Sequence, residues 1–229
     1  MATNKKGEQG GIENIEHALS RTEQLIENNQ KTVTIVFIVI LLIVGGFLGV
    51  KRYYIAPKEK EAQEQMFMAE KYFGVDSVRL ALEGDGNYLG FLDIRDEYKI
   101  TKSGKLANYY IGICYLRMGE YEDAINYLKK FKTKSKIIGP VAKGAIGDAY
   151  VELQDYEEGL NYYLKAVDQN DNEFTAPLYM MKAGLVYEEL GQYEDALKMY
   201  EKVELEYPFT SQGRQVNKYI SRVKVKINS

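Results

Sequence analysis

The sequence predicts an all-α protein in which one transmembrane helix precedes a solenoid of stacked helical hairpins. Two observations predict this fold class: an uncharged apolar stretch near the N-terminus, and a twenty-residue pattern that occurs three times without internal gaps. The chain has 229 residues, 45% of them hydrophobic, and a formal charge of −3. The part outside the apolar stretch is therefore long enough for one globular domain of ordinary size.

The apolar stretch extends from Val33 to Val50. As a helix its 18 residues would be ~27 Å long, about the thickness of a hydrocarbon core. It leads into two basic residues and two tyrosines, Lys51 to Tyr54, which suit the membrane interface, and it is longer than the apolar part of a cleaved signal peptide. We therefore predict an uncleaved transmembrane signal anchor at residues 32–55.

Residues 1–31 are predicted to form a short cytoplasmic head with an amphipathic helix. The apolar residues that would share one helical face are Ile12, Ile15, Leu19 and Ile26. Within the anchor, Gly45 and Gly49 have the small-xxx-small spacing that lets transmembrane helices pack closely. Such pairs also occur by chance, so a helix–helix contact there is one of two interpretations.

The repeated pattern indicates three helical hairpins. Its copies begin at Gly112, Gly147 and Gly184. In each copy a tyrosine follows the first small residue by three positions, a second tyrosine comes six positions later, and a second small residue three after that. Small residues let two helices approach closely, and the rings fill the space beside them. Helix breaks are expected between the two helices of each copy, at Gly119, Asp155 and Gly191.

Less regular segments flank the three copies. A degenerate copy precedes them, with matching residues at Ala69, Tyr72, Val78 and Ala81. The stretch Gly84–Asn87 is predicted to be a turn, and Tyr88–Tyr98 is helix-like. A polar-faced capping helix is predicted from about Ser211 to Ile227, as solenoids need for solubility. The repeat domain as a whole is predicted at 56–229.

The pattern resembles the tetratricopeptide repeat, in which small and aromatic residues recur over two antiparallel helices, often closed by a proline such as Pro208. The resemblance implies a right-handed superhelix with a concave protein-binding groove. It places in that groove Tyr109, Ile113, Arg117, Asp148, Val151, Glu152, Met181, Leu185 and Glu188. This apolar to acidic surface departs from the carboxylate-clamp type, so a hydrophobic or basic segment is the expected ligand. The alternative is that many of these side chains simply pack within the groove.

Reactive groups are too few for an enzyme to be predicted. The single histidine, His17, lies in the head, and Cys114 lies in an apolar helical pattern that suggests core packing. Gly84–Asn87 fits neither a phosphate loop nor a calcium loop. Charges are balanced, and the basic residues Lys218, Arg222, Lys224 and Lys226 are expected on a solvated last helix. We predict a non-catalytic protein with no cofactor, no metal and no nucleic-acid partner.

One span after a short head, followed by such repeats, also resembles the YfgM-type ancillary subunit of the bacterial Sec translocon. The segments GDGNYLGFLDIRDEY and GKLANYYIGICYLRMGEYEDAI resemble anchored repeat proteins of the Bacteroidota. This resemblance implies a single-pass inner-membrane protein with its repeats in the periplasm. The partners it implies are Sec translocon subunits, a membrane-anchored prolyl-isomerase chaperone of the PpiD type, unfolded client polypeptides and membrane lipid.

The charges beside the span do not settle the orientation of the chain. Lys and Arg counted near the span favour a cytoplasmic body, but this rule weakens when a large domain follows. A cytoplasm-facing adaptor, which the charge count favours, therefore remains an open alternative. A second alternative is a structural scaffold of an envelope machine, such as type IX secretion.

Overall fold

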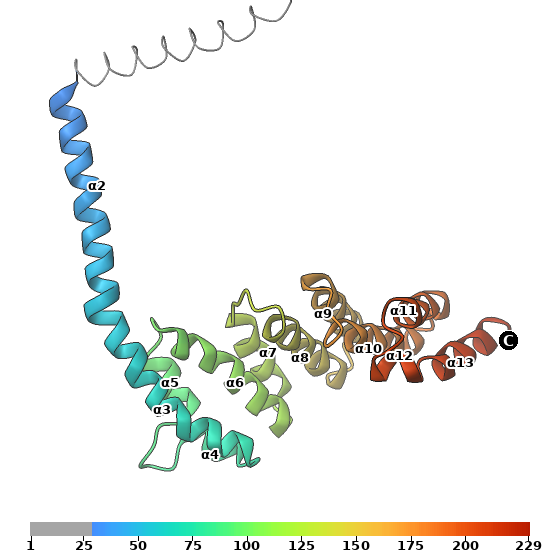
Figure 1. Ribbon diagram of the computed structural model, residues 1–229. Coiled ribbons are helices and arrows are strands. Elements are labelled where there is room, and N and C mark those ends of the chain that lie inside the picture. Colours follow the sequence, from blue (N-terminus) through green and yellow to red (C-terminus); the bar gives the residue numbers. More distant parts are fainter. Residues whose placement is uncertain (1–28) are drawn as a thin grey trace, which may run out of the picture. The chain divides into compact units, whose positions relative to one another are not determined.

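The structure is a computed structural model that describes residues 29–229 (Figure 1). It divides into two compact units, Met1–Pro57 and Lys58–Ser229, which are described separately. His17 and the predicted amphipathic segment of the head lie outside the described residues. Within residues 29–229 the regular structure is helical, apart from one isolated antiparallel bridge between Gly84 and Leu89. The all-α prediction is confirmed.

The first unit contains α2 (Gln30–Val50), which holds the whole apolar stretch. None of its 21 residues is buried, and its length and composition suffice to cross a membrane. A signal sequence near the N-terminus would have the same properties. A π-helical segment, η1 (Lys51–Ile55), follows. A Cβ added at Gly45 or Gly49 would meet no atom within 4 Å, so the contact predicted for these glycines stays a prediction.

The second unit is a series of helices that begins with α3. Figure 1 shows α6 to α11 following one another as antiparallel pairs. The helices are α3 (Ala56–Gly74), α4 (Val78–Glu83), α5 (Phe91–Glu97), α6 (Lys102–Met118), α7 (Tyr121–Lys130), α8 (Ile138–Glu152), α9 (Tyr156–Gln169), α10 (Ala176–Glu189), α11 (Tyr193–Glu206), α12 (Ser211–Gln215) and α13 (Asn217–Ile227). The three predicted hairpins are α6–α7, α8–α9 and α10–α11.

Each hairpin closes on the first small residue of its repeat. A Cβ added to Gly184 would lie 2.3 Å from a ring carbon of Tyr200, and one added to Gly147 would lie 2.7 Å from the ring of Tyr163. Gly112 faces Leu128 in the same way, at 2.5 Å. Contacts this short are steric clashes, so only glycine lets the paired helices approach this closely.

The turns between paired helices use left-handed backbone conformations. Gly119 and Gly191 have φ of +82° and +70°, as the sequence led us to expect. In the middle hairpin the left-handed residue is Gln154, with φ of +62°. Asp155, which the sequence marked as the break, instead caps α9 by accepting a hydrogen bond from the Glu158 amide at 3.2 Å. The break is therefore one residue earlier than expected.

The segments that flank the hairpins also bury apolar residues. Ala69 and Ala81 of the degenerate copy are fully buried. Asp85 Oδ1 accepts the amide hydrogens of Asn87 and Tyr88 at 2.9 and 2.8 Å, which makes Gly84–Asn87 a turn, as predicted. At the other end Val216, Ile220 and Val223 of the cap pack in the same core cluster as Tyr200 and Val203.

Candidate functional site

A pocket on the first helices of the three hairpins brings together four of the nine predicted groove residues, Asp148, Val151, Glu152 and Leu185. We call it the groove pocket. It has a volume of about 470 Å³ and is lined by Leu116, Tyr121, Asp148, Val151, Glu152, Tyr163, Lys182, Leu185 and Val186. These residues come mainly from α6, α8 and α10, because each repeat places its first helix on the same side of the stack.

The polar part of the groove pocket is centred on Asp148. Lys182 Nζ lies 2.6 and 2.8 Å from its two carboxylate oxygens, and the Tyr163 hydroxyl donates a hydrogen bond to Oδ1 at 2.6 Å. Burial and the nearby Asp148 charge raise the pKa of Tyr163 above its ordinary value, so this hydroxyl keeps its proton. The Asp148 charge is thus neutralised within the protein.

The rest of the groove pocket is apolar with one acidic edge. Leu185 is 39% exposed, and Leu116 and Val151 are half-buried. Glu152 is exposed and accepts a hydrogen bond from the Tyr121 hydroxyl at 3.2 Å. No ion pair of Glu152 is found among residues 29–229. A ligand would therefore meet aliphatic side chains beside one carboxylate that lacks a cation.

Three of the other predicted groove residues lie on α6 outside this pocket. Tyr109 is half-buried, and its ring centroid lies 5.5 Å from that of Phe131. Ile113 is half-buried in the same cluster. The Arg117 guanidinium stacks 4.1 Å from the centroid of the Phe73 ring. Its Nη1 lies 3.4 Å from Asp76 Oδ1. These side chains pack within the second unit rather than beside Asp148.

The last two predicted groove residues, Met181 and Glu188, are each only 8% exposed. Glu188 accepts hydrogen bonds from Arg222 of α13 and from the Tyr200 hydroxyl, and Lys226 Nζ lies 3.6 Å away. Arg222 and Lys226 therefore do more than form the solvated face expected for the last helix. Glu188 joins the cap to α10 and is not open to a ligand.

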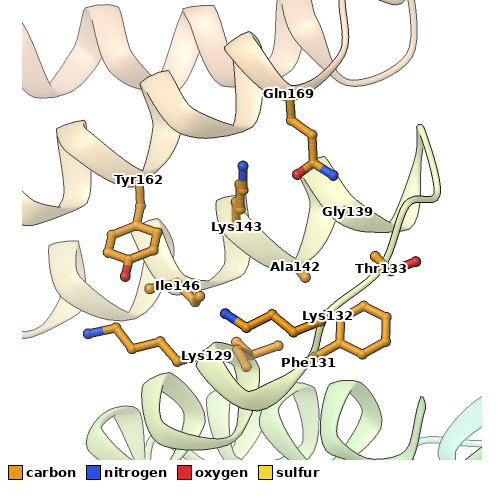
Figure 2. Close-up of a pocket in the computed structure, with 11 residues that line it drawn as sticks. Lys129, Phe131, Lys132, Thr133, Gly139, Ala142, Lys143, Ile146, Tyr162 and Gln169 are labelled. Carbon is orange, nitrogen blue, oxygen red and sulfur yellow. The ribbon is translucent and has the colours of Figure 1, made fainter. Parts of the chain in front are cut away.

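A second pocket was not indicated by our sequence reasoning (Figure 2). We call it the lysine pocket. It has a volume of about 450 Å³ and is lined by Leu128, Lys129, Phe131, Lys132, Thr133, Gly139, Ala142, Lys143, Ile146, Tyr162 and Gln169. The signal that could have found it is the segment KKFKTKSK at 129–136, which departs from the balanced charge expected of the body.

The described residues offer little reactive chemistry. Among residues 29–229, no group of three or more His, Cys, Asp or Glu side chains could hold a metal ion. Cys114 is fully buried, as its apolar context predicted. Burial raises the pKa of its thiol to about 12, so the reactive thiolate is scarce at neutral pH.

Comparisons with known proteins support a fold of tetratricopeptide repeats. Two tetratricopeptide-repeat family models match the chain, one over residues 106–135 and one over residues 145–209. The TPR-like repeats of a Podosopora anserina kinesin light chain have a similar crystal structure, with a TM-score of 0.57 and 11% identity over 74% of this chain and 88% of that one. The crystal structure of MamA is similar with a TM-score of 0.53 and 17% identity, over 73% of this chain and 88% of that one. Identities this low indicate a shared fold alone. No curated protein sequence matches the chain.

Proposed function

Because the chain is a tetratricopeptide-repeat protein with a long apolar N-terminal helix, we propose that it is a membrane-anchored module whose groove pocket binds a segment of another protein. Repeat domains of this kind are protein-binding scaffolds, typically without catalysis. In this proposal residues 32–55 are the anchor and residues 56–229 the binding domain. The observation that carries the proposal is the groove pocket, to which three consecutive first helices contribute the aliphatic side chains of Leu116, Val151 and Leu185.

The chemistry of the groove pocket favours an apolar segment with a nearby basic residue. Complete burial of one leucine-sized side chain of the partner in this pocket would contribute roughly 1.5–3 kcal/mol. Asp148 already has Lys182 as its counterion, so it offers little to a second cation. Within residues 29–229 Glu152 has no counterion, and it suits a lysine or arginine of the partner. Tyr109, Ile113 and Arg117 would support the groove by packing, and Met181 and Glu188 by holding α10.

The anchor has its own test, because an uncleaved span and a cleaved signal sequence predict different products. Retention of the anchor leaves a 26.2 kDa protein that resists carbonate extraction from vesicles. A shorter product that carbonate releases would exclude the anchor. Retention of the anchor would also hold the groove pocket beside a partner in the same membrane, which raises the effective concentration of that partner.

The finer proposal is that this module is an ancillary subunit of the Sec translocon. Its support is architectural: one apolar helix followed by protein-binding repeats. The chain would then lie in the bacterial inner membrane with its repeats in the periplasm, and bind a membrane-anchored prolyl-isomerase chaperone or an emerging polypeptide. Protease digestion of the repeat domain in spheroplasts would support this orientation, and protection would favour a cytoplasmic body.

Copurification tests the proposed partners. The full chain is purified in mild detergent beside Leu185→Asp, which places a charge on an exposed side chain and leaves the core intact. We expect channel or chaperone subunits to copurify with the unmodified chain and to be lost from the variant. Glu189→Gln, at an exposed site on the same helix, is the matched control. Recovery of no channel or chaperone subunit would overturn the translocon proposal.

A further inference from the structure

The lysine pocket lies between α7, α8 and α9 and shares no residue with the groove pocket. Figure 2 shows Lys129, Lys132 and Lys143 around one space, with Tyr162 and Gln169 contributed by α9. The floor is apolar, formed by Leu128, Ala142 and Ile146, which belong to the core and are only 1–4% exposed. The pocket thus combines a recessed apolar floor with a cationic rim.

The two pockets use opposite faces of α8. The lysine pocket takes Gly139, Ala142 and Ile146, and the groove pocket takes Asp148 and Val151. Successive α-helical residues are about 100° apart, so the centres of these two sets are roughly half a turn apart around the helix. Occupation of one pocket therefore leaves the other open.

The surroundings of the lysine pocket are cationic in a chain whose formal charge is −3. Between Ala124 and Gly147 there are six lysines and no Asp or Glu. Among residues 29–229 no carboxylate lines the pocket, and no ion pair neutralises the three rim lysines. Like charges held together without a counterion repel one another, and an anion removes this repulsion.

Two of the rim lysines are held in place by neutral groups. Lys129 Nζ donates a hydrogen bond to the Tyr150 hydroxyl at 2.7 Å, and Lys143 Nζ donates one to the Lys165 carbonyl at 3.2 Å. The contact with Tyr150 raises the pKa of Lys129, so the ammonium stays charged at neutral pH. These bonds position the cations without cancelling their charge.

We propose that the lysine pocket binds an acidic segment of a partner polypeptide, with one large apolar side chain on the floor and flanking carboxylates on Lys129, Lys132 and Lys143. A small inorganic anion would leave the floor of this 450 Å³ pocket uncovered. An anionic membrane surface is the competing partner, because Ile137 and Ile138 are exposed beside the lysines. A flat bilayer does not fill a recessed floor, so the cavity favours the peptide.

The test measures binding of a fluorescein-labelled peptide, DDEFLEDD, to the full chain in an uncharged detergent. We expect saturable binding that Lys132→Glu weakens about tenfold and that high salt also weakens. Lys132 is exposed, so this variant should fold, which its thermal unfolding checks. Lys218→Glu makes the same charge change on α13 and should bind as the unmodified chain does. A peptide with serines in place of its two apolar residues should bind more weakly, because the floor is then left empty.

Three outcomes would overturn the proposal. One is that the acidic peptide does not bind. Another is that Lys132→Glu and Lys218→Glu weaken binding equally, which indicates a general charge effect. The third is that dihexanoyl phosphatidylglycerol binds in a Lys132-dependent way and more tightly than the peptide does. Leu185→Asp changes the groove pocket and leaves the lysine pocket intact. Binding of the acidic peptide therefore tests the lysine pocket separately from any failure of the groove pocket to bind its partner.

Discussion

Arg222 on the cap helix donates two hydrogen bonds to Glu188 on α10, from Nε at 3.1 Å and from Nη2 at 2.5 Å. The Glu188 side chain is only 5% exposed, and its remaining partners are Tyr200 and Lys226. Although burial opposes ionisation, the hydrogen bonds from Arg222 and Tyr200 keep the pKa of Glu188 below its ordinary value. The cap is therefore held by a charge network as well as by apolar contacts.

Replacing Arg222 should destabilise the repeat domain. Arg222→Met leaves a buried carboxylate with fewer donors, which costs about 1–3 kcal/mol because Tyr200 and Lys226 remain. Urea unfolding of the full chain in detergent, followed by circular dichroism, measures the change. Lys218→Met, at an exposed position on the same helix, should leave the midpoint unchanged. Equal midpoints for the two variants would contradict the structural role of the pair.

The same network should make stability depend on pH in the acidic range. The folded protein holds the pKa of Glu188 below 4.5, the ordinary value that the unfolded chain retains. The stabilisation is therefore fully present above about pH 4.5 and is lost as the pH falls through the lower folded pKa. Urea unfolding from pH 7 to pH 3 should show this loss, and Glu188→Gln should reduce it. If Glu188→Gln has the same dependence of stability on pH as the unmodified chain, the loss of stability at low pH comes from other carboxylates.

The hairpins were predictable because their determinants are local and periodic. Gly184 and Tyr200 belong to one copy of the pattern, as Gly147 and Tyr163 do, so the spacing alone indicates that they meet. The turn at Gln154 was less predictable. A left-handed residue is usually glycine or asparagine, but here it is Gln154. The amides of Gln154 and Asp155 donate hydrogen bonds to the carbonyls of Val151 and Tyr150, both at 2.9 Å, and close this turn.

The candidate site was predictable only in part. The resemblance to the tetratricopeptide repeat placed Asp148, Val151 and Leu185 in one groove, and these three side chains line the groove pocket. The same reasoning placed Glu188 in the groove, because it takes no account of Arg222, which reaches Glu188 from 34 residues further along the chain. The lysine pocket depends on how Phe131, Lys132 and Thr133, which follow α7, lie beside α8 and α9, and no periodicity encodes that arrangement.

At Gly184, the first small residue of the last repeat, α10 and α11 lie too close together to accept an added methyl group. Gly184→Ala places a Cβ 2.3 Å from the ring of Tyr200, which is fully buried and cannot move freely. We expect a loss of about 1–3 kcal/mol in the free energy of unfolding. Gly74→Ala is the matched control, because a Cβ there meets nothing within 4 Å. If both variants unfold at the same urea concentration, the tight packing of α10 on α11 is not required for stability.

The balance of charge in the groove pocket should set its preference among ligands. Lys182 is the counterion of Asp148 and, among the described residues, the one cation that lines this pocket, so Lys182→Met removes that charge. Asp148 then keeps its hydrogen bond from Tyr163 and becomes available, beside Glu152, to a basic partner. A labelled peptide that alternates leucine and arginine should bind the variant about tenfold more tightly than the unmodified chain, with a steeper salt dependence. Lys198→Met, whose ion pair with Asp195 is exposed, should leave the affinity unchanged. Unchanged affinity in the Lys182 variant would mean that Asp148 stabilises the hairpin and takes no part in ligand choice.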